Sequence, residues 1–128
     1  MKAEHIVLTP HAPAPVGPYS QAVQVGRALF CSGQIPLDPE TGEMIEGDIA
    51  AQTERVIENL GAVLCAGGCH FADVVKTTVY LVDMNDFAAM NAVYDRYFGA
   101  TKPTRSTVAV AALPKGARVE IDCTLHLG

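Results

Sequence analysis

Residues 73–83 read DVVKTTVYLVD, and this run of β-branched and aromatic side chains between two aspartates decides the class of fold. Such residues favour the extended backbone of a strand. Strict alternation assigns its side chains to two sides, with Val74, Thr78, Tyr80 and Val82 on one and Val75, Thr77, Val79 and Leu81 on the other. Both sides are largely apolar, which predicts a strand at the centre of a sheet.

An amphipathic helix is predicted before this strand and another after it. The first follows Asp48, a suitable N-cap, and stops at Gly67-Gly68. Its apolar side chains recur at helical spacing and form one face: Ile49, Val56, Ile57, Leu60, Val63 and Leu64. Its polar side chains are assigned to the other face: Gln52, Glu54, Arg55, Glu58 and Asn59. The second helix is predicted from about Asp86 to Phe98, with Gly99 as its terminator.

The remaining strands complete the order β-β-β-α-β-α-β-β. They are predicted at His5–Leu8, Gln21–Val25, Ala28–Ser32, Arg105–Ala111 and Arg118–Leu127. This order indicates an α+β fold in a single domain over residues 1–128, with two helices packed on one face of a mixed sheet. The other face is too apolar to be left in water. We therefore expect other copies of the chain to bury it in an obligate homo-oligomer.

Charge and hydropathy exclude several classes of function. Nine lysines and arginines and fourteen aspartates and glutamates give a net charge of −5. A protein that binds nucleic acid through its overall charge would be positive, so this charge has the wrong sign. No apolar stretch approaches the roughly 20 residues of a membrane span, and no secretory signal opens the chain. A cytoplasmic protein is expected. Arginines and lysines predominate from Arg96 onward, where a small anion could be held.

The four cysteines do not form a metal motif. Cys65-x-x-x-Cys69-His70 lacks the second cysteine pair or the paired histidines of zinc modules, and Cys31 and Cys123 lie far away in sequence. Without a secretory signal, disulfides are not expected either. The cysteines are predicted to be free thiols packed as small hydrophobic side chains.

Three polar residues are candidates for chemistry, each with an ordinary alternative. The Arg105 guanidinium opens a strand and suits a carboxylate, although an ordinary surface arginine or a structural ion pair is the alternative. Glu120 lies on the polar face of the last strand. It is either a solvated carboxylate or, if a neighbouring subunit buries it, one with a raised pKa that can handle water. Asn91 interrupts the apolar stripe of the second helix, where its amide either ties down backbone or faces a pocket.

Other positions are weaker candidates. Tyr19 ends a proline-rich segment and could simply plug the sheet, while Ser32 and Gly33 end a predicted strand and could turn their backbone groups into a groove. His70 and His126 are acid–base groups by type, but no hydrolase triad is recognisable around them. No Walker or Rossmann glycine pattern follows a strand.

Several separated motifs together resemble one family. The most specific is Pro103-Thr104-Arg105-Ser106-x-Val108, followed by Leu113-Pro114-x-Gly116 and Val119-Glu120-Ile121. Supporting matches are Gly17-Pro18-Tyr19-Ser20-Gln21-Ala22, Ser32-Gly33-Gln34-Ile35-Pro36, Lys76-Thr77-Thr78-Val79 and Asp86-Phe87 with Asn91. Over nearly its whole length the chain resembles the Rid, or YjgF-like, family and within it the RidA-type enamine/imine deaminases.

The resemblance implies a chorismate-mutase-like fold and a homotrimer with an inner barrel and clefts between subunits. It implies hydrolysis of 2-imino acids or their enamines, such as 2-aminoacrylate, 2-iminopropanoate and 2-iminobutanoate, to 2-keto acids and ammonia, which protects other enzymes from these reactive metabolites. No metal or organic cofactor is implied. Arg105 would clamp the substrate carboxylate and Glu120 would position or deprotonate water. Five residues would line the cleft: Tyr19, Ser32, Gly33, Ile35 and Asn91.

One position departs from the family pattern. Many relatives have cysteine two residues after the arginine, where this chain has Thr107. If the backbone N–H of that position contacts substrate, threonine can serve; if a thiol provides redox control, the control is lost. Three alternatives stay open: an endoribonuclease or translation inhibitor, a non-enzymatic ligand-binding trimer, and a specialised enzyme acting on a pathway enamine.

Overall fold

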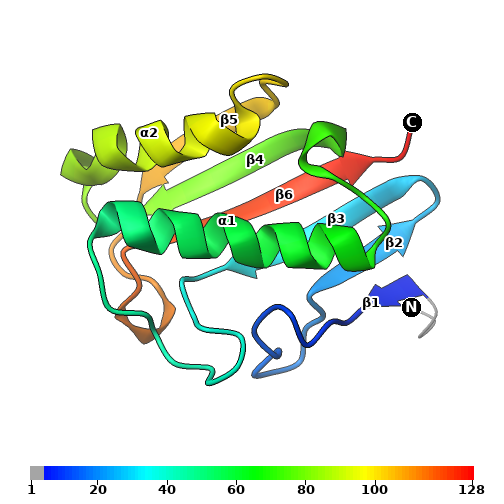
Figure 1. The fold of residues 1–128 in the computed structure, drawn as a ribbon, viewed down its shortest axis with the longest axis horizontal. Coiled ribbons are helices and arrows are strands. Elements are labelled where there is room, and N and C mark those ends of the chain that lie inside the picture. The colour runs from blue at the N-terminus through cyan, green and yellow to red at the C-terminus, as the bar shows by residue number, and fades with distance from the viewer. Residues whose placement is uncertain (1–4) are drawn as a thin grey trace.

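The computed structural model describes residues 5–128, so residues 1–4 of the predicted domain lie outside the described part (Figure 1). One six-stranded sheet has the order β1-β2-β3-β6-β4-β5. Its strands are β1 (Ile6–Val7), β2 (Ala22–Val25), β3 (Ala28–Gln34), β4 (Val74–Leu81), β5 (Thr104–Ala109) and β6 (Val119–His126). Only the β4–β5 pair is parallel in this sheet, and β5 forms one of its edges. The predicted mixed sheet is confirmed.

Both helices lie across the same face of this sheet, as predicted (Figure 1). Helix α1 (Ile49–Ala66) begins where the Asp48 carboxylate accepts a hydrogen bond from the Ala51 backbone N–H, and it ends at Gly67. Helix α2 (Phe87–Phe98) ends at Gly99. The core between helices and sheet is apolar, and Val56, Ile57, Val79 and Ile121 have no exposed surface. Within residues 5–128, no helix combines the length and the hydropathy needed to cross a membrane.

The alternation predicted for the central strand is wrong at its start. Val74 is buried with Thr77, Val79 and Leu81, whereas Val75 is 48% exposed. A β-bulge between Val74 and Lys76 in the pairing with β6 inserts one extra residue. Because a bulge shifts the two-residue period, the side chain of Val74 moves to the helix-covered face.

The face assigned to two polar residues of α1 is also wrong. Gln52 and Asn59 are buried, although their residue types placed them on the solvent side of the helix. Each has a main-chain partner: the Gln52 Oε1 accepts from the Arg118 N–H, and the Asn59 Nδ2 donates to two carbonyls. Burial of a side-chain amide costs little free energy when hydrogen bonds within the protein replace its hydrogen bonds to water.

The prediction for the cysteines is wrong at one position. All four thiols are free, and Cys31, Cys69 and Cys123 are buried as expected. Cys65 is exposed, because it lies beyond the edge of the apolar stripe of α1 that Val63 and Leu64 occupy.

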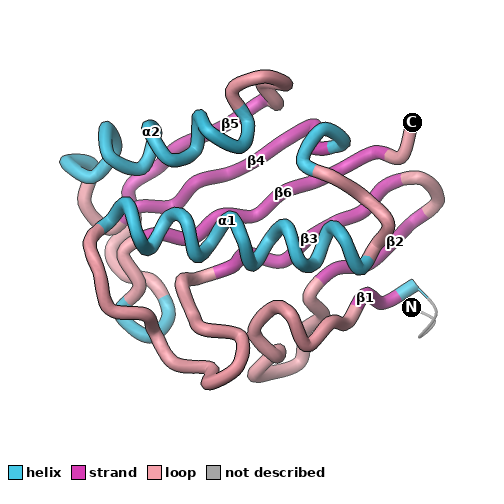
Figure 2. The backbone as a smooth tube through the Cα atoms, in the orientation of Figure 1, coloured by secondary structure: helices cyan, strands magenta, loops and turns pink. Residues whose placement is uncertain are grey.

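Long connections gather at one end of the sheet. Figure 2 shows the loop from β3 to α1 and the loop from β5 to β6 at this end, with the proline-rich segment before β2 beside the first of them. The 3₁₀ turn Pro114–Gly116 interrupts the β5–β6 loop. The β3–α1 loop contains a turn at Asp38, whose carboxylate accepts from the backbone N–H of Glu40.

Candidate functional site

Glu120 lies on the helix-free face of the sheet, opposite its neighbours in β6. Val119 and Ile121 are fully buried on the helix-covered face, so the alternation of the strand turns Glu120 the other way. It pairs across the sheet with Tyr80 of β4. On its other side it meets β3 at Gly33, where a Cβ atom would lie 2.8 Å from the Glu120 Cδ. The missing side chain of Gly33 therefore provides the space that the carboxyl group fills.

This arrangement corrects the prediction that β3 ends at Ser32. The strand continues to Gln34, with a bulge between Cys31 and Gln34 in its pairing with β6. The Ser32 hydroxyl donates to the Ser20 carbonyl over 2.6 Å, and its N–H donates to the Gln21 carbonyl. Ser32 and Gly33 thus form the irregular part of the strand, where a bulge commonly redirects backbone toward a site.

Five of the predicted site residues line one cavity of about 510 Å³: Tyr19, Ser32, Gly33, Ile35 and Glu120. Tyr19 is 52% exposed and packs beside the cavity, so it is not a buried plug. Apolar side chains make up much of the remaining wall, from Pro13, Ala14, Val16, Leu37 and Pro114. Gln21 and Lys115 add polar groups. The cavity is mostly apolar with a few converging polar groups, which is typical of a small-molecule site.

The environment of Glu120 disfavours its charged form. Burial raises the pKa of its carboxyl group, and the nearby Asp122 carboxylate raises that pKa further. Asp122 is itself fixed, because the Tyr80 hydroxyl donates to its Oδ2 over 2.9 Å. A carboxylate with a raised pKa is a stronger base, which suits it to take a proton from water.

Arg105 occupies a second cluster, on the helix-covered face. Its partner in β4 is Thr77, which is fully buried beneath the helices. The Arg105 Nη1 donates to the Asn91 Oδ1 over 2.7 Å, so the Asn91 amide holds a side chain beside a pocket rather than backbone. The guanidinium carbon lies 4.7 Å from the centre of the Tyr94 ring and 5.6 Å from that of Phe87. An amide and two rings of α2 therefore orient the guanidinium.

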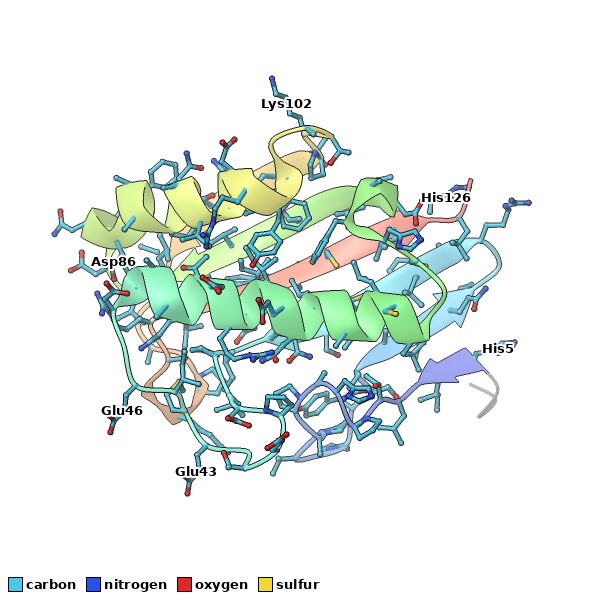
Figure 3. The ribbon with its side chains drawn as sticks, in the orientation of Figure 1. His5, Glu43, Glu46, Asp86, Lys102 and His126 are labelled. Atoms are coloured by element: carbon cyan, nitrogen blue, oxygen red, sulfur yellow. The ribbon has the colours of Figure 1, made fainter. Side chains whose placement is uncertain are left out.

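A smaller cavity of about 320 Å³ opens beside this cluster, lined by Asn91, Tyr94 and Arg105 among others. No carboxylate of residues 5–128 forms an ion pair with Arg105, so the alternative of a structural ion pair is not realised within the described chain. Lys102 borders the same cavity, but Figure 3 shows its side chain projecting away from the body of the protein. Arg105 is thus the cation that this cavity offers to an anion.

Thr107 lies two residues further along β5, on the same face as Arg105. It pairs with the buried Val79. Its Oγ1 is buried and has no hydrogen-bond partner among residues 5–128. A buried hydroxyl without a partner is uncommon in proteins.

The structure therefore divides the predicted site into two clusters on opposite faces of the sheet. Tyr19, Ser32, Gly33, Ile35 and Glu120 surround the larger cavity, and Asn91, Arg105 and Thr107 lie under or beside α2. Strand β4 lies between β6, which carries Glu120, and β5, which carries Arg105 and Thr107. Within one chain, Arg105 and Glu120 cannot contact the same small molecule.

Other candidates from the sequence remain outside both clusters. His70 and His126 are exposed and line neither cavity. No group of three or more histidine, cysteine or acidic side chains within residues 5–128 is placed to hold a metal ion. The acidic residues Glu43 and Glu46 of the β3–α1 loop point outward, away from the cavity (Figure 3).

Sequence reasoning missed Gln21, Tyr94 and Lys115. Lys115 lines the Glu120 cavity with φ of 56°, a left-handed conformation that non-glycine residues rarely adopt. Tyr94 belongs to the apolar stripe of α2, and its ring packs against the Arg105 guanidinium. The sequence did offer one signal for a role of Tyr94. It lies on the same stripe as Asn91, the polar residue that interrupts the apolar pattern, and both lie on the side of α2 that faces β5.

Comparison with known proteins finds similar sequences and structures that belong to one family. The profile of the family described as Endoribonuclease L-PSP matches residues 9–127. A RutC family protein of Pyrococcus abyssi is 55% identical, covering 97% of this chain and 98% of the relative. A mouse protein named 2-iminobutanoate/2-iminopropanoate deaminase is 50% identical, covering 91% of this chain and 87% of its own length. The crystal structure of a Thermotoga maritima protein described as a putative endoribonuclease superposes with a TM-score of 0.94 at 53% identity, covering 98% of both chains.

Proposed function

Because the chain belongs to the Endoribonuclease L-PSP family, also known as the YjgF or Rid family, we propose that it hydrolyses 2-imino acids and their enamine tautomers to 2-keto acids and ammonia. The substrates are small, as in 2-iminopropanoate and 2-iminobutanoate. The observation that carries this proposal is Glu120, a carboxyl group of raised pKa in a mostly apolar cavity over Gly33. The name of the mouse relative supports the same chemistry.

The reaction needs an anion site as well as a base. Arg105 is held by Asn91 and the rings of α2, and it has no carboxylate partner in the described chain. Its planar fork of donors fits the carboxylate of a 2-imino acid in a bidentate manner. Imines without a carboxylate would lose this interaction.

The hydrolysis follows from these two groups. Water loses a proton to Glu120 and its oxygen attacks the carbon of the protonated imine, which forms a carbinolamine. The nitrogen takes the proton back from Glu120, and the C–N bond breaks as the carbinolamine oxygen forms the keto group. The hydroxyl proton passes to the departing ammonia, so the keto acid and ammonium leave. The imine carbon is already electrophilic, so orientation of substrate and water supplies much of the rate.

We propose that a homotrimer completes the site. Arg105 and Glu120 lie on opposite faces of one sheet, so a cleft that holds both must take them from two copies of the chain. The helix-free face also exposes the large apolar side chains of Phe30 and Val108, which a second copy could cover. The Arg105 cluster borders β5, an edge strand that is accessible to a neighbour.

The decisive experiment supplies the imine enzymatically. Threonine dehydratase releases 2-iminobutanoate from threonine, and 2-ketobutyrate formation is followed with and without the protein, in ammonia-buffered and unbuffered controls. We expect faster ketobutyrate release, abolished by Arg105→Ala and kept by Arg96→Ala, which removes an exposed arginine on the outer side of α2. No acceleration by folded wild-type protein would overturn the proposal.

The family description makes ribonuclease activity the competing function. The net charge of −5 opposes it, because RNA binding depends on neutralising phosphates. Incubation of the same preparations with RNA tests this alternative. Cleavage that survives purification and is lost in Arg105→Ala would favour the ribonuclease. Saturable binding of 2-keto acids without any turnover would favour a ligand-binding trimer.

A further inference from the structure

Two side-chain amides that the sequence did not mark as functional are buried beside the Glu120 cavity. Gln21 is 1% exposed and Asn59 is 0% exposed. Neither amide contacts Glu120, and both bond to main-chain segments whose side chains line the cavity. We propose that Gln21 and Asn59 are positioning residues that hold the two main-chain walls of this cavity. The inference rests on the proposed function, because its kinetic consequence concerns imine hydrolysis.

Gln21 holds the wall formed by the proline-rich segment. Its Oε1 accepts from the Thr9 N–H over 2.7 Å, and its Nε2 donates to the carbonyls of Thr9 and Pro13, each over 3.0 Å. A longer contact of 3.4 Å reaches the Ala12 carbonyl. One side-chain amide thus provides hydrogen-bond partners for the main-chain groups of a loop that forms few main-chain hydrogen bonds of its own. That loop continues into Ala14, Val16 and Tyr19, which line the cavity.

Asn59 holds the facing wall, which follows β3. Its Nδ2 donates to the Leu37 carbonyl over 2.9 Å and to the Ile35 carbonyl over 3.3 Å. Its Oδ1 accepts from the Arg55 Nε over 3.1 Å, which fixes the orientation of the amide. The segment is therefore attached to α1, the longer of the two α-helices, and both Ile35 and Leu37 line the cavity.

These bonds cannot be replaced without movement of the walls. Thr9 and Leu37 are each only 6% exposed, so their main-chain groups have little access to water in the observed conformation. A buried donor or acceptor that loses its partner carries the full cost of its desolvation. The segments would shift toward solvent to recover hydrogen bonds, and the cavity would lose its shape.

Loss of the walls should affect binding more than the chemical step. The two amides act on loops, whereas Glu120 is positioned by β6 and by Gly33 of β3. The walls contact the substrate before and during reaction alike, so their displacement weakens binding of both states. KM is then expected to rise while kcat stays near its wild-type value.

The test combines hydrogen exchange with kinetics on the intact protein. The variants are Gln21→Met and Asn59→Leu, which keep side-chain size and remove the hydrogen bonds. Val63→Ala, at a fully buried position of α1 that does not line the cavity, is the control for a general loss of stability. We expect exchange at the Thr9 amide to accelerate at least roughly tenfold in Gln21→Met and KM to rise by roughly tenfold in both amide variants. Val63→Ala should change neither.

Each outcome decides the inference. Wild-type exchange at Thr9 and wild-type KM in Gln21→Met would overturn it, as would an equal rise of KM in Val63→Ala. If Gln21→Met does not fold, Gln21→Asn keeps the amide on a shorter side chain and is expected to show the same two changes. If the wild-type protein itself shows no hydrolysis, the proposed function fails, and exchange at Thr9 alone decides whether Gln21 holds the wall.

Discussion

The carboxyl group of Glu120 lies against the main chain of Gly33, so closely that a Cβ atom on residue 33 would come within 2.8 Å of the Glu120 Cδ. Real Cβ atoms essentially never approach another atom so closely. The glycine is therefore required by space and not by a left-handed backbone conformation, because its φ is not positive. The position of the carboxyl group therefore depends on this contact with β3.

Gly33→Ala is expected to displace Glu120 while leaving the protein folded. The added methyl group meets the flexible end of a side chain, which can rotate away. Misplacement of a catalytic group by about 1 Å can cost up to about 100-fold in rate, so we expect kcat for imine hydrolysis to fall by roughly 10- to 100-fold. Steady-state kinetics measure the effect, with thermal unfolding as a check on the fold. Unchanged kcat would show that Glu120 does not act from its observed position.

Asp122→Asn is expected to move the acid limb of the pH–rate profile to lower pH. The Asp122 carboxylate raises the pKa of Glu120, and its neutralisation removes that repulsion. Glu120 acts in its ionised form, so activity should persist to more acidic pH. The measurement is kcat/KM against pH. Tyr80→Phe is the matched control, because it removes the hydrogen bond to Asp122 and keeps the charge; a shift of the same size in this variant would attribute the effect to geometry.

Glu120→Gln is expected to abolish hydrolysis and to stabilise the fold at neutral pH. Burial raises the pKa of this carboxyl group in the folded state, so the folded state holds the proton more tightly than the unfolded state. Wild-type stability therefore falls as pH rises from the ordinary value of about 4.3 through the raised folded value. Glu120→Gln has no group that titrates at this position, so it lacks this loss of stability with rising pH. Its advantage in thermal stability should be present near about pH 7.5 and absent below about pH 4; an equal advantage at both would contradict the assignment.

Two substitutions of Tyr94 should distinguish the contribution of its ring from the contribution of its hydroxyl. The hydroxyl bonds to the fully buried Thr77 over 2.8 Å, so Tyr94→Phe should cost about 1–3 kcal/mol of stability and leave KM unchanged. Tyr94→Leu also removes the ring beside the Arg105 guanidinium, and KM should rise by up to about tenfold. Denaturant unfolding and steady-state kinetics measure the two effects. Equal KM values in both variants would exclude orientation of Arg105 by the ring.

A charge on the helix-free face should prevent assembly. Phe30 is 47% exposed there, and Phe30→Glu would place a carboxylate in the proposed contact between subunits. We expect a smaller particle in analytical ultracentrifugation and loss of hydrolysis, since no chain would hold Arg105 and Glu120 in one cleft. Ala66→Glu, at an exposed position of α1, is the control and should keep both properties. An active Phe30→Glu monomer would refute the two-copy site.

Local signals in the sequence predicted the elements well and their irregularities poorly. The Asp48 cap, the apolar spacing of α1 and the alternation of β6 each depend on residues close together in the chain, and each is confirmed. The bulge at Val75 depends on the pairing of β4 with β6, about 50 residues away in the sequence. The burial of Asn59 likewise depends on carbonyls of the β3–α1 loop. Such features follow from partners that a local pattern does not contain.

By itself, the sequence determined the order of helices and strands, the covered and uncovered faces of the sheet, and the residue types from which Arg105, Asn91 and Glu120 were selected. The tertiary structure decided that Arg105 and Glu120 lie on opposite faces of the sheet. It also decided that Gln21 and Asn59 attach the cavity walls. The physical reason is that the face of a strand residue, and the partner of a buried amide, are fixed by pairing and packing between segments distant in sequence.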